Sequence, residues 1–158
     1  MKGVALDSSA VFTFCLNPGL TIHSVHSAGQ QLKFKRDKQI VLVDFGTKHA
    51  KGDTISATFR YDGQIDNSFC YLDIPPEVLQ ASNKKFLFNI DKQYSFQTKN
   101  YLMLTPETYW YPRAGTSYSD KNPDWQQTYF SNYRLKVKPL PGLVPLSQGE
   151  GKDRKSVV

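Results

Sequence analysis

The sequence predicts an all-β fold, an antiparallel β-sandwich. Three observations support this prediction. Aromatic residues make up 13% of the 158 residues, and residues of this kind favour strands. Short runs alternate between apolar and polar side chains, which is the pattern of half-buried strands. The 10 Gly and 9 Pro are spread between these runs, where they suit turns.

The strands of the first half are the clearest. We expect them at residues 11–16, 20–25, 32–35, 40–45 and 54–61. Turns are expected at 17–19 (Asn-Pro-Gly), 27–30 and 37–39, and a polar loop at 46–53. The run 40–45 is almost continuously apolar, which predicts a strand buried on both faces. Residues 54–61 alternate strictly, so one face is expected in the core and the other in solvent. The core face has Ile55, Ala57, Phe59 and Tyr61, and the solvent face has Thr54, Ser56, Thr58 and Arg60.

The second half is less regular. Short strands are expected near 69–72, 86–90, 94–96 and 101–104, and a last strand at 133–138. One short helical turn is expected near 75–80, with two prolines at its start. Residues 105–125 predict a long ordered loop. Residues 1–151 are expected to form one domain, truncated at both ends. Residues 152–158 are expected to be a non-native or disordered tail, since 153–158 match one translated frame of a common sequencing adapter.

The charge pattern speaks against nucleic-acid binding. The formal net charge is +6, but the basic residues form no block. Lys33, Lys35 and Arg36 are interleaved with apolar residues, as are the basic residues of 133–138. This pattern is typical of the solvated face of a strand, whereas a phosphate-binding patch needs clustering on one face. No apolar run is long enough to span a bilayer and no signal peptide is evident, so we expect a cytoplasmic protein or a targeting element outside this stretch.

The chain offers no convincing catalytic or metal site. His23 and His26 are three residues apart, and on a regular strand such positions face opposite ways. The sequence contains no His-Glu-x-x-His, no Gly-x-Ser-x-Gly and no phosphate-binding loop. Cys15 and Cys70 lie in apolar stretches, so we expect two buried thiols, and whether they pair stays open. Neither a catalytic residue nor a metal ligand is predicted.

The aromatic triplet Tyr109-Trp110-Tyr111 is the most unusual feature. Adjacent residues of an extended chain point to opposite sides, so three aromatic side chains in a row cannot all enter one core. Pro112 limits Tyr111 to extended conformations and holds the group in place. One interpretation is a plug or seam within the domain. The other is a surface that docks on a further domain or a ligand.

Four segments, taken in order, resemble the N-terminal domain of M1-family (aminopeptidase N-like) zinc metallopeptidases. They are a strand–turn–strand opening, a strand with the pattern Gly-x4-aliphatic-x-aromatic-x-Tyr-x-Gly, a segment ending in an aromatic–Pro pair, and a closing strand with a Ser-x-Gly exit. These segments are 14–20 with 22–25 and 31–34, then 51–65, then 101–112, and last 129–139 with 146–150. The residues of the first and third segments are similar to those of bacterial proteins in which an M1-like peptidase is joined to an ABC-transporter-type permease.

The resemblance implies a saddle-like β-sandwich that is noncatalytic, packs on the catalytic domain of the same chain and borders its substrate cleft. Zinc, a peptide substrate and any membrane contact would then belong to parts of the parent protein beyond this stretch, and the location would be the extracytoplasmic side of a bacterial membrane. In the family's Gln-x-Glu motif only Glu107 has a match, which makes it the one candidate for the substrate cleft. Tyr109, Trp110 and Tyr111 would form the interdomain surface. Whether the parent would be active, and on which substrate, stays open.

A second class of function fits the same composition. A self-standing extracytoplasmic adhesion or carbohydrate-binding β-sandwich would use its aromatic side chains to stack on sugars. The candidates for stacking are Tyr109, Trp110, Tyr111 and Trp125.

Overall fold

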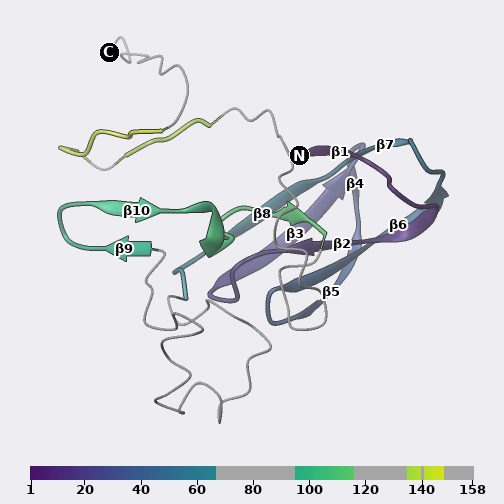
Figure 1. The fold of residues 1–158 in the computed structure, drawn as a ribbon, viewed down its shortest axis with the longest axis horizontal. Coiled ribbons are helices and arrows are strands. Elements are labelled where there is room, and N and C mark those ends of the chain that lie inside the picture. Colours follow the sequence, from purple (N-terminus) through teal and green to yellow (C-terminus); the bar gives the residue numbers. More distant parts are fainter. Residues whose placement is uncertain (67–94, 116–134, 140, 148–158) are drawn as a thin grey trace, which may run out of the picture.

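The structure is a computed structural model that describes residues 1–66, 95–115, 135–139 and 141–147. Its fold is all-β and sandwich-like, as the sequence predicts, with antiparallel pairing in every sheet (Figure 1). Within the described ranges, the one helical element is a single 3-10 turn, η1 (Pro106–Thr108). In this part of the chain no helix has the length and apolar character needed to cross a membrane.

The larger sheet has four strands in the order β11-β2-β6-β5. The strands are β2 (Ser9–Cys15), β5 (Lys33–Asp37), β6 (Ile40–His49) and β11 (Arg113–Ala114). Phe12 of β2 lies opposite Val43 of β6, which lies opposite Phe34 of β5. These three apolar side chains therefore form one row across the inner face of the sheet.

The smaller sheet has three strands in the order β4-β3-β8. The strands are β3 (Leu20–Ser27), β4 (Gln30–Gln31) and β8 (Thr58–Gly63). A short ladder of β1 (Lys2–Val4) with β7 (Thr54–Ser56) continues it through Ala57, whose N–H donates to the Met1 carbonyl. Ala28 and Gly29 connect β3 to β4 with positive φ values of 48° and 81°, as a two-residue hairpin turn requires.

The core lies between these two sheets. Phe14 of the larger sheet and Phe59 of the smaller one meet edge to face, with ring centroids 5.1 Å apart. The buried members of the core are Phe14, Leu16, Leu20, Val25, Val41, Val43 and Ala57. At roughly 25 cal/mol for each Å² of apolar surface removed from water, this layer is the main source of the domain's stability.

The predicted alternation of residues 54–61 is confirmed, whereas the predicted two-sided burial of 40–45 is wrong. All four side chains predicted for the core face are buried or half-buried, and the four predicted for solvent are exposed. In β6, Val41 and Val43 are buried but Leu42 is 41% exposed. Leu42 lies between Thr13 and Lys35 on the outer face, which no described element covers at that position. A one-sided antiparallel sheet therefore accounts for this strand.

A β-bulge in β3 corrects the predicted placement of the two histidines. The register with β8 shifts between Ile22 and Ser24, so His23 is the extra residue. The bulge lets Ile22 and Val25 both pack inward, although they are three residues apart. His26 consequently lies opposite the exposed Thr58, and both histidines are on the outer face, not on opposite faces.

The predicted loop 46–53 is shorter than expected, because β6 continues to His49. Gly46 adopts a φ of 72° and its N–H donates to the Asp44 carboxylate, which allows an irregular step in the ladder without ending the strand. The remaining turn is closed at Ala50, whose N–H donates to the Asp53 carboxylate at 2.7 Å.

The second half of the chain contributes a two-stranded hairpin of β9 (Ser95–Gln97) and β10 (Leu102–Leu104), to one side of the packed sheets (Figure 1). The sequence predicts a strand at 133–138. Residues 135–138 are exposed and belong to no sheet of the described structure, so the prediction is wrong for them. Several predicted features fall outside the described residues. They are the strands near 69–72 and 86–90, the helical turn near 75–80, Cys70, Trp125 and the tail 152–158.

Candidate functional site

Asn17 organises the corner where the sandwich meets the aromatic triplet. Its side chain is completely buried. The side-chain oxygen accepts from the N–H groups of Gly19 (3.0 Å) and Asp66 (2.8 Å). The side-chain nitrogen donates to the carbonyls of Thr108 (2.9 Å) and Asp66 (3.2 Å). All four hydrogen bonds available to the amide are used, so one residue ties together three segments that are distant in sequence.

Two glycines allow these segments to approach so closely. A Cβ built on Gly19 would lie 2.0 Å from the Gln64 carbonyl oxygen. A Cβ on Gly63 would lie 2.5 Å from the Gly19 carbonyl oxygen, and the φ of Gly63 is 127°. Any larger residue at either position would force the start of β3 away from the end of β8.

Arg36 reinforces the same corner, contrary to the predicted solvated face. It shares the inner face of β5 with Phe34, while Lys33 and Lys35 are exposed as expected. Its guanidinium donates to the carbonyls of Asn17 (2.7 Å), Leu16 (3.3 Å) and Leu20. The planar fork of Arg36 thus reaches three carbonyls of the 16–20 turn, where the Asn17 carbonyl also accepts from the Leu20 N–H at 3.0 Å. Partial burial lowers the pKa of Arg36.

The aromatic triplet begins at the end of η1. Tyr109 adopts a left-handed conformation, with a φ of 51°, and its N–H donates to the Pro106 carbonyl at 3.2 Å. Its own carbonyl accepts from the Asn17 N–H at 2.9 Å. This second bond anchors the triplet to the buried corner, so its backbone is positioned by the core of the domain.

The three side chains make different contacts. Tyr109 lies under the Arg113 guanidinium, which is 5.4 Å from the ring centroid. Burial raises the pKa of Tyr109, and the nearby Arg113 charge opposes that rise. Trp110 meets Tyr111 edge to face at 4.8 Å, and the Trp110 carbonyl accepts from the Tyr61 hydroxyl at 3.1 Å. Tyr109 and Trp110 are half-buried and Tyr111 is 37% exposed, so none of the three is fully enclosed.

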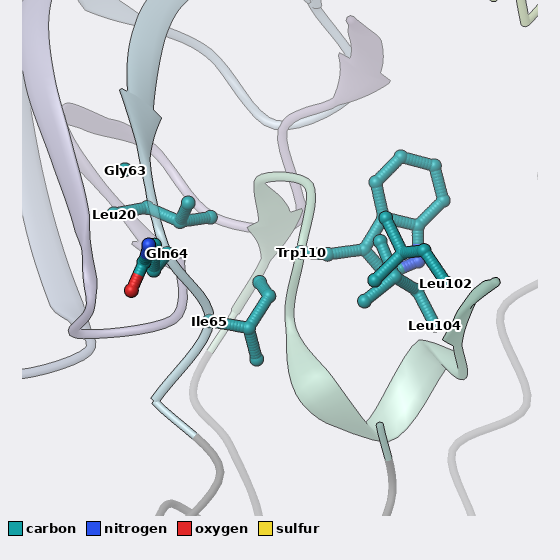
Figure 2. A pocket seen from close by; sticks show the side chains of 7 residues that line it. All are labelled: Leu20, Gly63, Gln64, Ile65, Leu102, Leu104 and Trp110. Carbon is teal, nitrogen blue, oxygen red and sulfur yellow. The ribbon is translucent and has the colours of Figure 1, made fainter. Parts of the chain in front are cut away.

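Trp110 borders an open apolar cavity of about 190 Å³. Figure 2 shows its indole beside Leu102 and Leu104, with Leu20 and Ile65 facing them from the sandwich. The complete lining is Leu20, Gly63, Gln64, Ile65, Leu102, Leu104 and Trp110. A cavity of this size accepts a benzene-sized apolar group. The arrangement suits an apolar side chain of a partner and offers no group for acid–base or nucleophilic chemistry.

Glu107 lies on η1 with an exposed side chain, and it does not line the cavity. Among the described residues, no group of three or more His, Cys, Asp or Glu is placed to hold a metal ion. His23 pairs with Asp62 at 2.9 Å on the open face of the smaller sheet, and His49 lies 3.9 Å from Asp53. Two-residue contacts of this kind lack the donor number that zinc requires.

Cys15 is buried, as predicted. Its thiol donates to the Gly115 carbonyl at 3.2 Å, and β11 pairs alongside β2 at this position. The thiol therefore serves the packing of β11 on β2.

No model of a known protein family matches the chain, and no curated protein or solved structure matches it.

Sequence reasoning selected the aromatic triplet but missed what holds and surrounds it. The Asn-Pro-Gly turn was recognisable, yet nothing in the sequence indicated that Asn17 reaches Asp66 and Thr108. The cavity was also missed, because Leu20 and Leu104 come from segments that pair with different neighbours. The one available signal was the apolar run at 101–104, which is too rich in large side chains for an exposed hairpin.

Proposed function

We propose that the chain is the noncatalytic N-terminal β-sandwich of an M1-type zinc aminopeptidase, packing on a following catalytic domain and bordering its substrate cleft. One observation carries the proposal. Trp110 lines an apolar cavity, and the partly exposed Tyr111 packs on Trp110, on a backbone fixed by Asn17. Rigid aromatic side chains beside a pocket are the usual anchors of interfaces.

The all-β sandwich and the resemblance of four ordered segments add support. In this proposal, the zinc and the groups that act on the peptide belong to the catalytic domain. The described residues of this chain would bind and orient that domain. Glu107, exposed next to the aromatic triplet, would face the substrate cleft.

The carbohydrate-binding alternative has less support. Sugar hydroxyls require several convergent polar groups, and Gln64 is the one polar side chain among the described residues that line the cavity. Titration of the protein with a panel of oligosaccharides tests this alternative directly.

The first test is the genomic sequence downstream of codon 151. The proposal expects an open reading frame that encodes Gly-x-Met-Glu-Asn and His-Glu-x-x-His. A reading frame that ends without such a domain would overturn it.

The second test is binding to that domain, expressed separately and titrated by calorimetry. Trp110→Ala and Tyr111→Ala should each weaken binding at least about tenfold, as expected for interface anchors. Leu42→Ala is the matched control, since Leu42 is also an exposed apolar residue but lies on the outer face of the larger sheet. Equal effects of all three substitutions would exclude the aromatic surface as the interface.

A further inference from the structure

The edge of β10 that faces away from β9 has the geometry of a self-complementary interface. In the described part of the chain, β10 pairs with β9 alone. The Thr98 N–H donates to the Tyr101 carbonyl at 3.0 Å, so this pair closes the hairpin as a hydrogen-bonded pair. Bonded and non-bonded pairs alternate along an antiparallel ladder. Leu102 and Leu104, opposite Gln97 and Ser95, are therefore in non-bonded pairs, and their backbone N–H and C=O groups point away from β9.

The side chains of this edge are unusually apolar for a surface. Leu102 is 61% exposed, Tyr101 54% and Met103 45%. Natural edge strands are normally protected by charged residues, proline or a covering element. β10 contains none of these protective residues, which marks its edge as a place where another strand adds.

We propose that two copies of this chain associate through β10, pairing antiparallel about a two-fold axis at Met103. In this register Leu102 of each copy lies opposite Leu104 of the other. Both outward-facing residues of each strand then find hydrogen-bond partners, which gives four inter-copy bonds. If the two-fold axis passed through Leu102 or Leu104 instead, one of the two leucines would lie opposite a residue outside β10 of the other copy. The pairing makes an isologous interface, the commonest kind among homodimers.

Charge complementarity supports a second copy as the occupant of this edge. Lys99 precedes β10 by three residues and Glu107 follows it by three, and both are exposed. Antiparallel pairing about Met103 brings the Lys99 end of one copy alongside the Glu107 end of the other. Because of the two-fold axis, this pairing of opposite charges occurs twice in the dimer. The inference goes beyond the proposed function and does not depend on it.

The test is analytical ultracentrifugation of the 158-residue chain over a concentration series. We expect a reversible monomer–dimer equilibrium. Leu102→Pro removes one outward N–H from each copy, and the dimer dissociation constant should rise at least about tenfold. Gln97→Pro is the matched control, because Gln97 lies opposite Leu102 in the same hairpin but its N–H points to the other edge. It should leave the dissociation constant unchanged.

The charges give an independent test that does not disturb the backbone. Lys99→Glu should raise the dissociation constant about threefold at low salt, and the double variant Lys99→Glu/Glu107→Lys should restore it. A chain that stays monomeric throughout the series would overturn the proposal. Equal effects of the two proline variants, or a double variant that remains as weak as Lys99→Glu, would also overturn it.

Discussion

The corner around Asn17 and the β9–β10 hairpin use their polar and apolar groups in opposite ways. At the corner, Asn17 and Arg36 bury polar atoms and satisfy them with backbone partners. In the hairpin, Leu102 and Met103 keep apolar side chains in solvent. Buried, satisfied polar groups define one local structure and rigidify it. Exposed apolar groups contribute little to the stability of the chain alone and are available to a partner. The corner therefore has a structural role, and the hairpin offers the edge at which we propose that a second copy pairs.

The largest expected effect is at the corner. Asn17→Ala would remove the donor to the buried Thr108 carbonyl and the acceptor of the half-buried Gly19 N–H. We expect a loss of about 4 kcal/mol in the free energy of unfolding, measured by urea denaturation, because each unsatisfied buried group costs about 1–3 kcal/mol. Ser9→Ala, which removes two exposed local hydrogen bonds with Val11, is the control and should change stability by less than about 0.5 kcal/mol. Similar losses for both variants would contradict the role given to Asn17.

The core layer should respond almost as strongly. Phe59→Ala removes a ring that packs edge to face on Phe14 and should cost about 3 kcal/mol in the same assay. Its neighbour Thr58 is exposed on the other face of β8, so Thr58→Ala should cost less than about 0.5 kcal/mol. A small cost at Phe59 would mean that the two sheets do not share a packed interior.

Alkaline pH should weaken the corner moderately. Burial raises the pKa of Tyr61 and of Tyr109 above the ordinary value of 10.0. The folded protein therefore holds these protons more tightly than the unfolded chain does, and stability falls as pH rises above about 10. Urea midpoints measured between neutral pH and pH values above the ordinary tyrosine pKa should show this decline. Tyr61→Phe should reduce its slope, and an unchanged slope would assign the effect to other groups.

The smallest effect is expected in the hairpin. Leu102→Ser changes a side chain that is 61% exposed, so the free energy of unfolding should move by no more than about 0.5 kcal/mol. Urea denaturation of the monomer at low protein concentration measures it. A loss comparable to that of Phe59→Ala would show that the hairpin belongs to the core, and the contrast between the two regions would fail.

The sequence predicted the periodic parts of this fold well. The alternation of 54–61 and the turns at 17–19, 27–30 and 37–39 depend on neighbouring residues, and the structure confirms them. The prediction of which side chains are buried failed where the answer depends on how a strand pairs or on what covers a sheet. The bulge at His23 shifts the faces of β3, and the open outer face of the larger sheet leaves Leu42 in solvent. Neither is encoded in local periodicity.

What the sequence determined by itself is the all-β class and the inward and outward faces of residues 54–61. These follow from strand geometry and the cost of leaving apolar surface in water. Only the tertiary structure decided that Asn17 joins three segments, that Arg36 turns inward, and that Trp110 meets Leu20 and Leu104 around one cavity. Hydrogen bonds and cavities of this kind depend on which distant segments meet, and no local pattern of residues specifies that meeting.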